Sequence, residues 1–115
     1  MNEKDLKVRT RKFAINIFNF IDNLPNRRSS NIIANQLGRS ASSVAANYRA
    51  ACRGRSHSEF IAKLGIVEEE ADESCFWLEL IIDSGLLTEE RIRPLLSEAG
   101  ELVAIMAASR KSAIK

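Results

Sequence analysis

Hydrophobic residues recur at steps of three and four along almost the whole chain, which is the spacing of one face of an α-helix. The most regular stretch holds Ile33, Leu37, Ala41, Val44 and Tyr48, at steps of four, four, three and four. Turn and capping residues separate this stretch from three others. The pattern therefore predicts four helices, over residues 5–22, 30–53, 57–84 and 89–110.

The boundaries of the predicted helices carry residues that end or begin helices. Pro25 cannot continue the first helix, so that helix should end just before it. Ser29 or Ser30 is expected to cap the second helix, and Gly54 is expected to end it in the left-handed conformation. Amphipathic helices with short connections pack as antiparallel neighbours. We therefore expect an all-α, antiparallel up-and-down four-helix bundle that forms one domain over residues 1–115.

The composition narrows the class of protein. Hydrophobic residues make up 45% of the chain and charged residues 28%, as in globular domains. No segment is apolar over the length of a membrane-spanning helix, and residues 1–12 lack the apolar core of a signal peptide. We therefore expect a cytoplasmic protein with no membrane partner. In that reducing compartment Cys52 and Cys75 should be free, buried thiols.

Motifs for catalysis and cofactor binding are not found in the sequence. It holds no nucleophile motif, no phosphate-binding loop and no dinucleotide fingerprint. A di-metal carboxylate bundle needs inward-facing Glu-x-x-His pairs, whereas His57 is the one histidine and has no glutamate three residues before it. The sequence therefore predicts a protein that is not an enzyme and that has no metal and no cofactor.

Charge is divided unevenly along the chain, although the formal net charge is only +2. Residues 1–57 hold 11 Lys and Arg against 3 Asp and Glu, whereas residues 58–115 hold 6 against 12. Either the two halves complement each other inside the bundle, or the basic half binds nucleic acid. For the second interpretation, the candidate contacts are Lys4, Lys7, Arg9, Arg11, Lys12, Arg27, Arg28, Arg49, Arg53 and Arg55.

A polar stripe runs beside the apolar stripe of the second predicted helix, among many small residues. Small side chains let another helix approach closely, and polar groups buried between the helices then need partners. Carboxylates of the third predicted helix could accept hydrogen bonds from this stripe. We therefore expect a polar seam, within the bundle or between subunits, made of Gln36, Arg39, Ser40, Ser43, Asn47, Glu70 and Glu73.

Residues 32–53 also permit an alternative interpretation, as a helix-turn-helix DNA-binding motif. Gly38 would lie in the turn, and residues 41–53 would enter the major groove. Against this, the apolar spacing keeps its phase through Gly38, where a turn should break it. A glycine inside a helix costs only about 1 kcal/mol, so we prefer one unbroken helix.

Several short segments are weak signals one by one, but their combination is specific to one family of proteins. They are Leu24-Pro25, Gln36-Leu37-x-Arg39-Ser40-Ala41, Asn47-Tyr48-Arg49, Glu70-Ala71-Asp72-Glu73-Ser74, Trp77-Leu78-Glu79-Leu80 and Glu98-Ala99-x-Glu101-Leu102. In this combination the chain resembles the bacterial four helix bundle protein family, named also for the protein encoded within the 23S rRNA intervening sequence. The resemblance implies a left-handed bundle that assembles into a ring-like homopentamer. Through relatives that serve diversity-generating retroelements, it also implies nucleic-acid binding and a protein partner such as a reverse transcriptase.

The leading hypothesis from the sequence is a non-catalytic, oligomeric interaction module. Its polar seam would organise packing or subunit contacts, and its basic N-terminal half would bind structured RNA or DNA.

Overall fold

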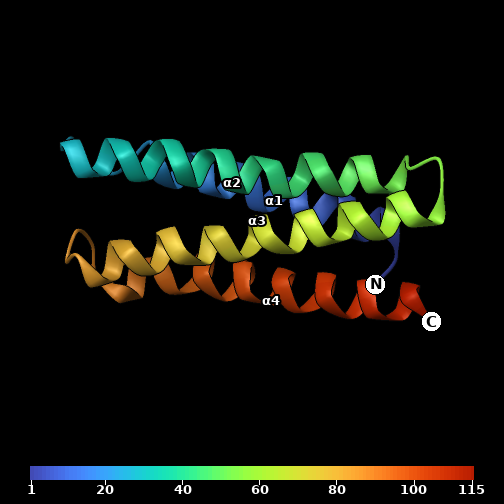
Figure 1. Cartoon of the computed structure of the whole chain (residues 1–115). Coiled ribbons are helices and arrows are strands. Elements are labelled where there is room, and N and C mark those ends of the chain that lie inside the picture. The colour runs from blue at the N-terminus through green and yellow to red at the C-terminus, as the bar shows by residue number, and fades with distance from the viewer.

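The structure of the protein is a computed structural model that describes residues 1–115. The four helices are α1 (Glu3–Ile21), α2 (Arg28–Cys52), α3 (His57–Asp83) and α4 (Glu89–Ile114). They run up and down along one rod of 44 × 19 × 19 Å, with both chain termini at the same end (Figure 1). The predicted all-α four-helix bundle is therefore confirmed. None of the helices combines the length and the apolar character that crossing a membrane requires.

The core runs along the whole axis of the rod, because every helix turns one apolar stripe inward. The stripe predicted for the second helix is buried in α2 from Ile33 to Ala51. Each fully buried aliphatic or aromatic side chain contributes about 1.5–3 kcal/mol to folding. The largest fully buried side chains are Phe13, Ile17, Leu37, Leu64, Leu78, Ile81, Ile92, Leu102 and Met106.

Helix α2 packs against α1 and α3, and α3 packs against α2 and α4. Helix α1 lies behind α2 and α3 in the view of Figure 1. Helix α1 also touches α4, over a shorter stretch than its contact with α2. A Cβ atom on Gly38 would lie 3.2 Å from Ile21 Cδ1 and 3.7 Å from Phe18 Cε1. The missing side chain of Gly38 therefore lets α1 approach α2 closely.

Helix α2 continues without a break through Gly38, from Arg28 to Cys52. A helix-turn-helix needs a turn at this point, so the helix-turn-helix alternative for residues 32–53 is wrong. The steady apolar phase of the sequence had favoured this outcome.

The predicted N-cap of α2 and the predicted left-handed conformation of Gly54 are wrong. The helix begins two residues earlier than predicted, with Arg27 as its N-cap and no side-chain capping bond. Ser29 and Ser30 consequently lie inside the first turn. At the other end, Gly54 does not adopt a positive φ, since Gly85 is the one residue of the chain that does. The Gly54 N–H instead donates to the Ala51 carbonyl oxygen at 3.1 Å, which continues the last turn.

Replacing Gly38 by leucine should lower the free energy of unfolding by about 1–3 kcal/mol, because the added side chain pushes against α1. Gly100→Ala is the matched control, since nothing lies within 4 Å of a Cβ atom at that position of α4. Alanine there should raise the free energy of unfolding by up to about 1 kcal/mol. Urea unfolding at fixed protein concentration measures both changes. A Gly38→Leu protein as stable as the parent would contradict close packing of α1 on α2.

Candidate functional site

An open groove of about 540 Å³ lies on the outer surface between α1 and α2. Five residues of α1 form one wall, and the other wall comes from α2 and the arginine that follows it. The lining residues are Lys7, Arg11, Ala14, Ile15, Phe18, Ser42, Ala45, Ala46, Arg49 and Arg53. Four of the ten carry a positive charge and none carries a negative charge.

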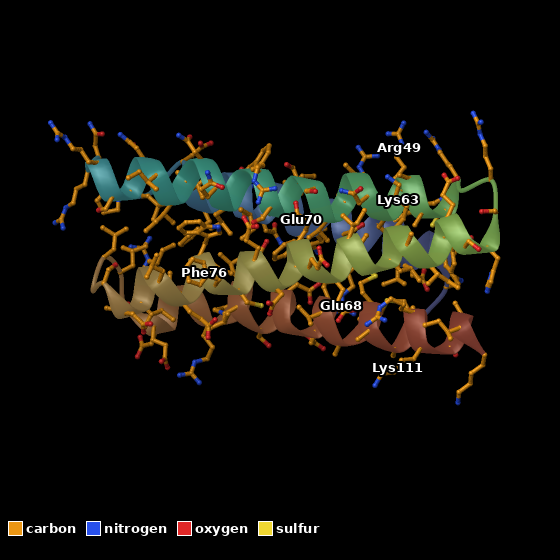
Figure 2. All side chains as sticks on the ribbon, viewed as in Figure 1. Arg49, Lys63, Glu68, Glu70, Phe76 and Lys111 are labelled. Atoms are coloured by element: carbon orange, nitrogen blue, oxygen red, sulfur yellow. The ribbon has the colours of Figure 1, made fainter.

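The groove arises from helical spacing on two antiparallel helices. Lys7 and Arg11 are one turn apart on α1, and Arg49 and Arg53 are one turn apart near the C-terminal end of α2. Because the helices run in opposite directions, the start of α1 lies beside the end of α2, which brings both pairs to the same end of the groove. Figure 2 shows Arg49 pointing outward from α2 at that end of the bundle.

The groove cations form no ion pair within the chain. Helix α2 contains no Asp or Glu, and α1 has none between Leu6 and Ile21. The cations that form ion pairs in this structure are Arg9, Arg39, Arg93 and Arg110. Lys7, Arg11 and both arginines on the α2 side are therefore free to meet an external anion.

The remaining predicted nucleic-acid contacts lie outside the groove. Lys4 and Lys12 are exposed on α1, and Arg55 is exposed between α2 and α3. Arg27 and Arg28 are exposed at the N-terminal end of α2, which is the far end of the rod from the groove cations. These five residues extend the basic surface but do not converge on one point.

Arg9, the last of the predicted nucleic-acid contacts, forms an ion pair inside the bundle. Its Nε and Nη2 atoms donate to the two carboxylate oxygens of Glu98 at 2.7 and 2.6 Å, and Glu101 lies 3.4 Å away. The hydrogen bond with Glu98 raises the pKa of Arg9 above its ordinary value. Arg9 therefore holds α1 against α4 and does not line the groove.

Arg39 is the centre of the predicted polar seam, and it joins α2 to α3. Its Nη1 atom donates to Glu70 Oε2 at 2.8 Å, and its Nη2 atom bonds with Glu73. Glu73 also accepts from Trp77 Nε1 at 3.2 Å, and Gln36 accepts from Arg39 Nε at 3.5 Å. Figure 2 shows Glu70 between the two helices. Hydrogen bonds to Glu70 and Glu73 raise the pKa of Arg39.

The other seam residues also bond within the chain. The Ser40 hydroxyl meets the Ser74 hydroxyl at 2.8 Å, and both serines are buried between α2 and α3. The Asn47 amide donates to the Ser43 hydroxyl at 2.8 Å, on the same helix. The expected seam is therefore a contact inside the bundle. Its Ser43 and Asn47 end is bonded within α2 and not to the acidic helix.

The apolar part of the groove was not predicted from the sequence. Ile15 and Phe18 keep 55% and 47% of their surface exposed. They follow Lys7 and Arg11 at helical spacing, whereas the core stripe of α1 runs through Phe13 and Ile17. That difference in phase is the signal that separates the groove wall from the core.

The chain's thiols and acids form no arrangement suited to nucleophilic or metal chemistry. Burial raises the pKa of the Cys75 thiol to about 11, and burial also raises the pKa of Cys52. Both side chains are therefore protonated at neutral pH, whereas the nucleophilic form of cysteine is the deprotonated thiolate. No three His, Cys, Asp or Glu side chains gather where they could hold a metal ion.

Arg39→Gln should lower the free energy of unfolding by about 0.5–1 kcal/mol, because it leaves the Glu70 carboxylate between α2 and α3 without its cation. Arg93→Gln is the matched control, since it removes an exposed ion pair with Glu89 one turn away on α4. The control should cost at most about 0.5 kcal/mol. Urea unfolding compares the two variants, and equal small losses would show that the Arg39 pairs do not join the helices.

Comparison with known proteins places this bundle in a family. No curated protein matches the chain. A solved structure from Bacteroides thetaiotaomicron, described as a protein of unknown function from the S23 ribosomal protein family, superposes with a TM-score of 0.89. It is 31% identical, and the match covers 96% of this chain and 99% of the other. The model of one protein family matches residues 3–108. The chain therefore belongs to the 23S rRNA-intervening sequence protein family.

Proposed function

We propose that this protein is a non-catalytic interaction module that binds structured RNA or DNA through the cations of α1 and α2. The observation that carries the proposal is the α1–α2 groove, where Lys7, Arg11, Arg49 and Arg53 converge with no carboxylate among them. Clustered cations without counter-charge create a positive potential, which attracts the phosphates of nucleic acid. Surrounding exposed cations, such as Lys4 and Lys12, add to this potential.

The names attached to the relatives support nucleic acid as the first ligand class to test. The family is named for the 23S rRNA intervening sequence, and the structural neighbour is described as belonging to an S23 ribosomal protein family. Both descriptions refer to the ribosome or its RNA. A protein partner such as a reverse transcriptase is a further proposal, and it rests on the sequence resemblance.

The second proposal is that the protein acts as an oligomer. Large apolar side chains remain exposed on all four helices, among them Val8 on α1, Ile32 on α2, Phe76 on α3 and Ile114 on α4. Contact with another copy would remove such side chains from water, at about 25 cal/mol for each Å² of apolar surface. The resemblance to ring-forming relatives makes a homopentamer the expected assembly.

Nucleic-acid binding should depend on salt and on the groove arginines. The Arg49→Gln/Arg53→Gln protein should bind a structured RNA at least about tenfold more weakly at low salt, since each charged phosphate contact contributes about 1 kcal/mol or more. The slope of log K against log salt should fall by about 1–2 units. Fluorescence anisotropy across a salt series measures both quantities.

The matched control is Arg91→Gln/Lys111→Gln, which removes two exposed and unpaired cations from α4. This control should retain most of the affinity and the slope of the parent. Absence of binding at low salt would refute the proposal, and so would equal losses in the two double variants.

The assembly should be visible as a mass well above that of one chain. Light scattering coupled to size exclusion at micromolar concentration should give about five times the 12.8 kDa of the monomer. A sample treated with nuclease is the control, because bound nucleic acid would otherwise add to the mass. A clean monomer after this treatment would contradict the oligomer.

A further inference from the structure

We infer that the α1–α2 groove binds an unpaired strand of nucleic acid, with its phosphates along the four cations and a base against the ring of Phe18. This inference rests on the proposed function and deepens it. A structured nucleic acid has single-stranded parts, such as loops and ends, and the groove would bind one of these parts.

The groove has a charged half and an apolar half. Gly38 of α2 lies beside Phe18 and Ile21 of α1, which fixes how the two antiparallel helices face each other. Counting back along α1 and forward along α2 places Arg49 beside the turn that carries Lys7 and Arg11. The cations therefore occupy one half of the groove, and Phe18 occupies the other half.

A single strand fits both halves, whereas a duplex fits only one. Phosphates of either form can pair with the four cations. The apolar half adds to the binding affinity only if a base lies against it. In a duplex the base faces are already stacked on each other. An unpaired base is free to stack on an aromatic ring, which contributes about 1–3 kcal/mol per base. Phe18 is 47% exposed, so its ring is accessible for this contact.

The size of the groove suits a short segment. Lys7 and Phe18 are eleven residues apart on α1, which is about 16 Å at 1.5 Å per residue. An extended single strand covers this distance with a few nucleotides. Ala14, Ala45 and Ala46 keep the floor of the groove low, so the strand can approach the helix backbones.

Charge favours a nucleic acid over a second copy of this chain as the occupant. A symmetric dimer across this groove would bring two sets of four cations together with no carboxylate between them. Nucleic acid instead supplies the missing negative charge and an aromatic face in one ligand.

The test compares a labelled 12-nucleotide single strand with a blunt duplex of the same length, by fluorescence anisotropy at one salt concentration. The parent protein should bind the single strand about tenfold more tightly. Phe18→Ala should weaken single-strand binding by about 5- to 100-fold and leave duplex binding unchanged. Phe18→Tyr keeps the aromatic face and should retain single-strand affinity, which separates stacking from damage to the fold.

Ile66→Ala is the control, because Ile66 is also an exposed large apolar side chain, at 38%, but lies on α3 outside the groove. It should leave both affinities unchanged. Equal or tighter duplex binding, with Phe18→Ala affecting both forms alike, would overturn this inference and leave the proposed function standing. A fall in oligomer mass in Phe18→Ala, with strand preference unchanged, would assign the groove to a subunit contact. No binding of either form would refute the proposed function itself.

Discussion

Small residues on α2 allow helices to pack closely on two of its sides, and the position of the candidate site follows from that packing. Gly38 admits Phe18 and Ile21 of α1, and Ser40 meets Ser74 of α3 through one hydrogen bond. Larger side chains at these positions would hold the neighbours apart. The approach of α1 is what places its cationic stripe beside that of α2, so a packing constraint in the core sets the geometry of the surface groove.

The uneven charge of the sequence serves two purposes in the fold. Arg9 and Arg39 bond with carboxylates of α4 and α3, so part of the basic half complements the acidic half within the chain. The remaining basic residues of α1 and α2 have no such partner, because their own helices carry almost no carboxylates. The two interpretations of the charge division are therefore compatible, and different residues carry them.

The sequence predicts the helices well because helical periodicity is a local property. The number of helices, the buried stripe of α2 and the role of Glu70 and Glu73 as acceptors for the polar stripe all follow from spacing along one or two helices. The ends of α2 were harder to predict, since several residues near each end can terminate a helix and tertiary packing selects among them.

The side to which each cation points could not be predicted. Arg9 and Arg11 are two residues apart, and one faces α4 while the other lines the groove with α2. Periodicity places both beside the core stripe, but the order of the helices around the bundle decides which neighbour each meets. The exposure of Ile15 and Phe18 depends on the same arrangement, because the residues of α2 that face this flank are small and leave the groove open.

Ultraviolet cross-linking of a short single-stranded oligonucleotide to the intact protein, followed by mass spectrometry of the peptides, tests the central claim most directly. The account predicts cross-links to the facing stripes of α1 and α2, with Phe18 among the modified residues. Cross-links that fall mainly on α3 and α4, or that spread evenly over the chain, would contradict it.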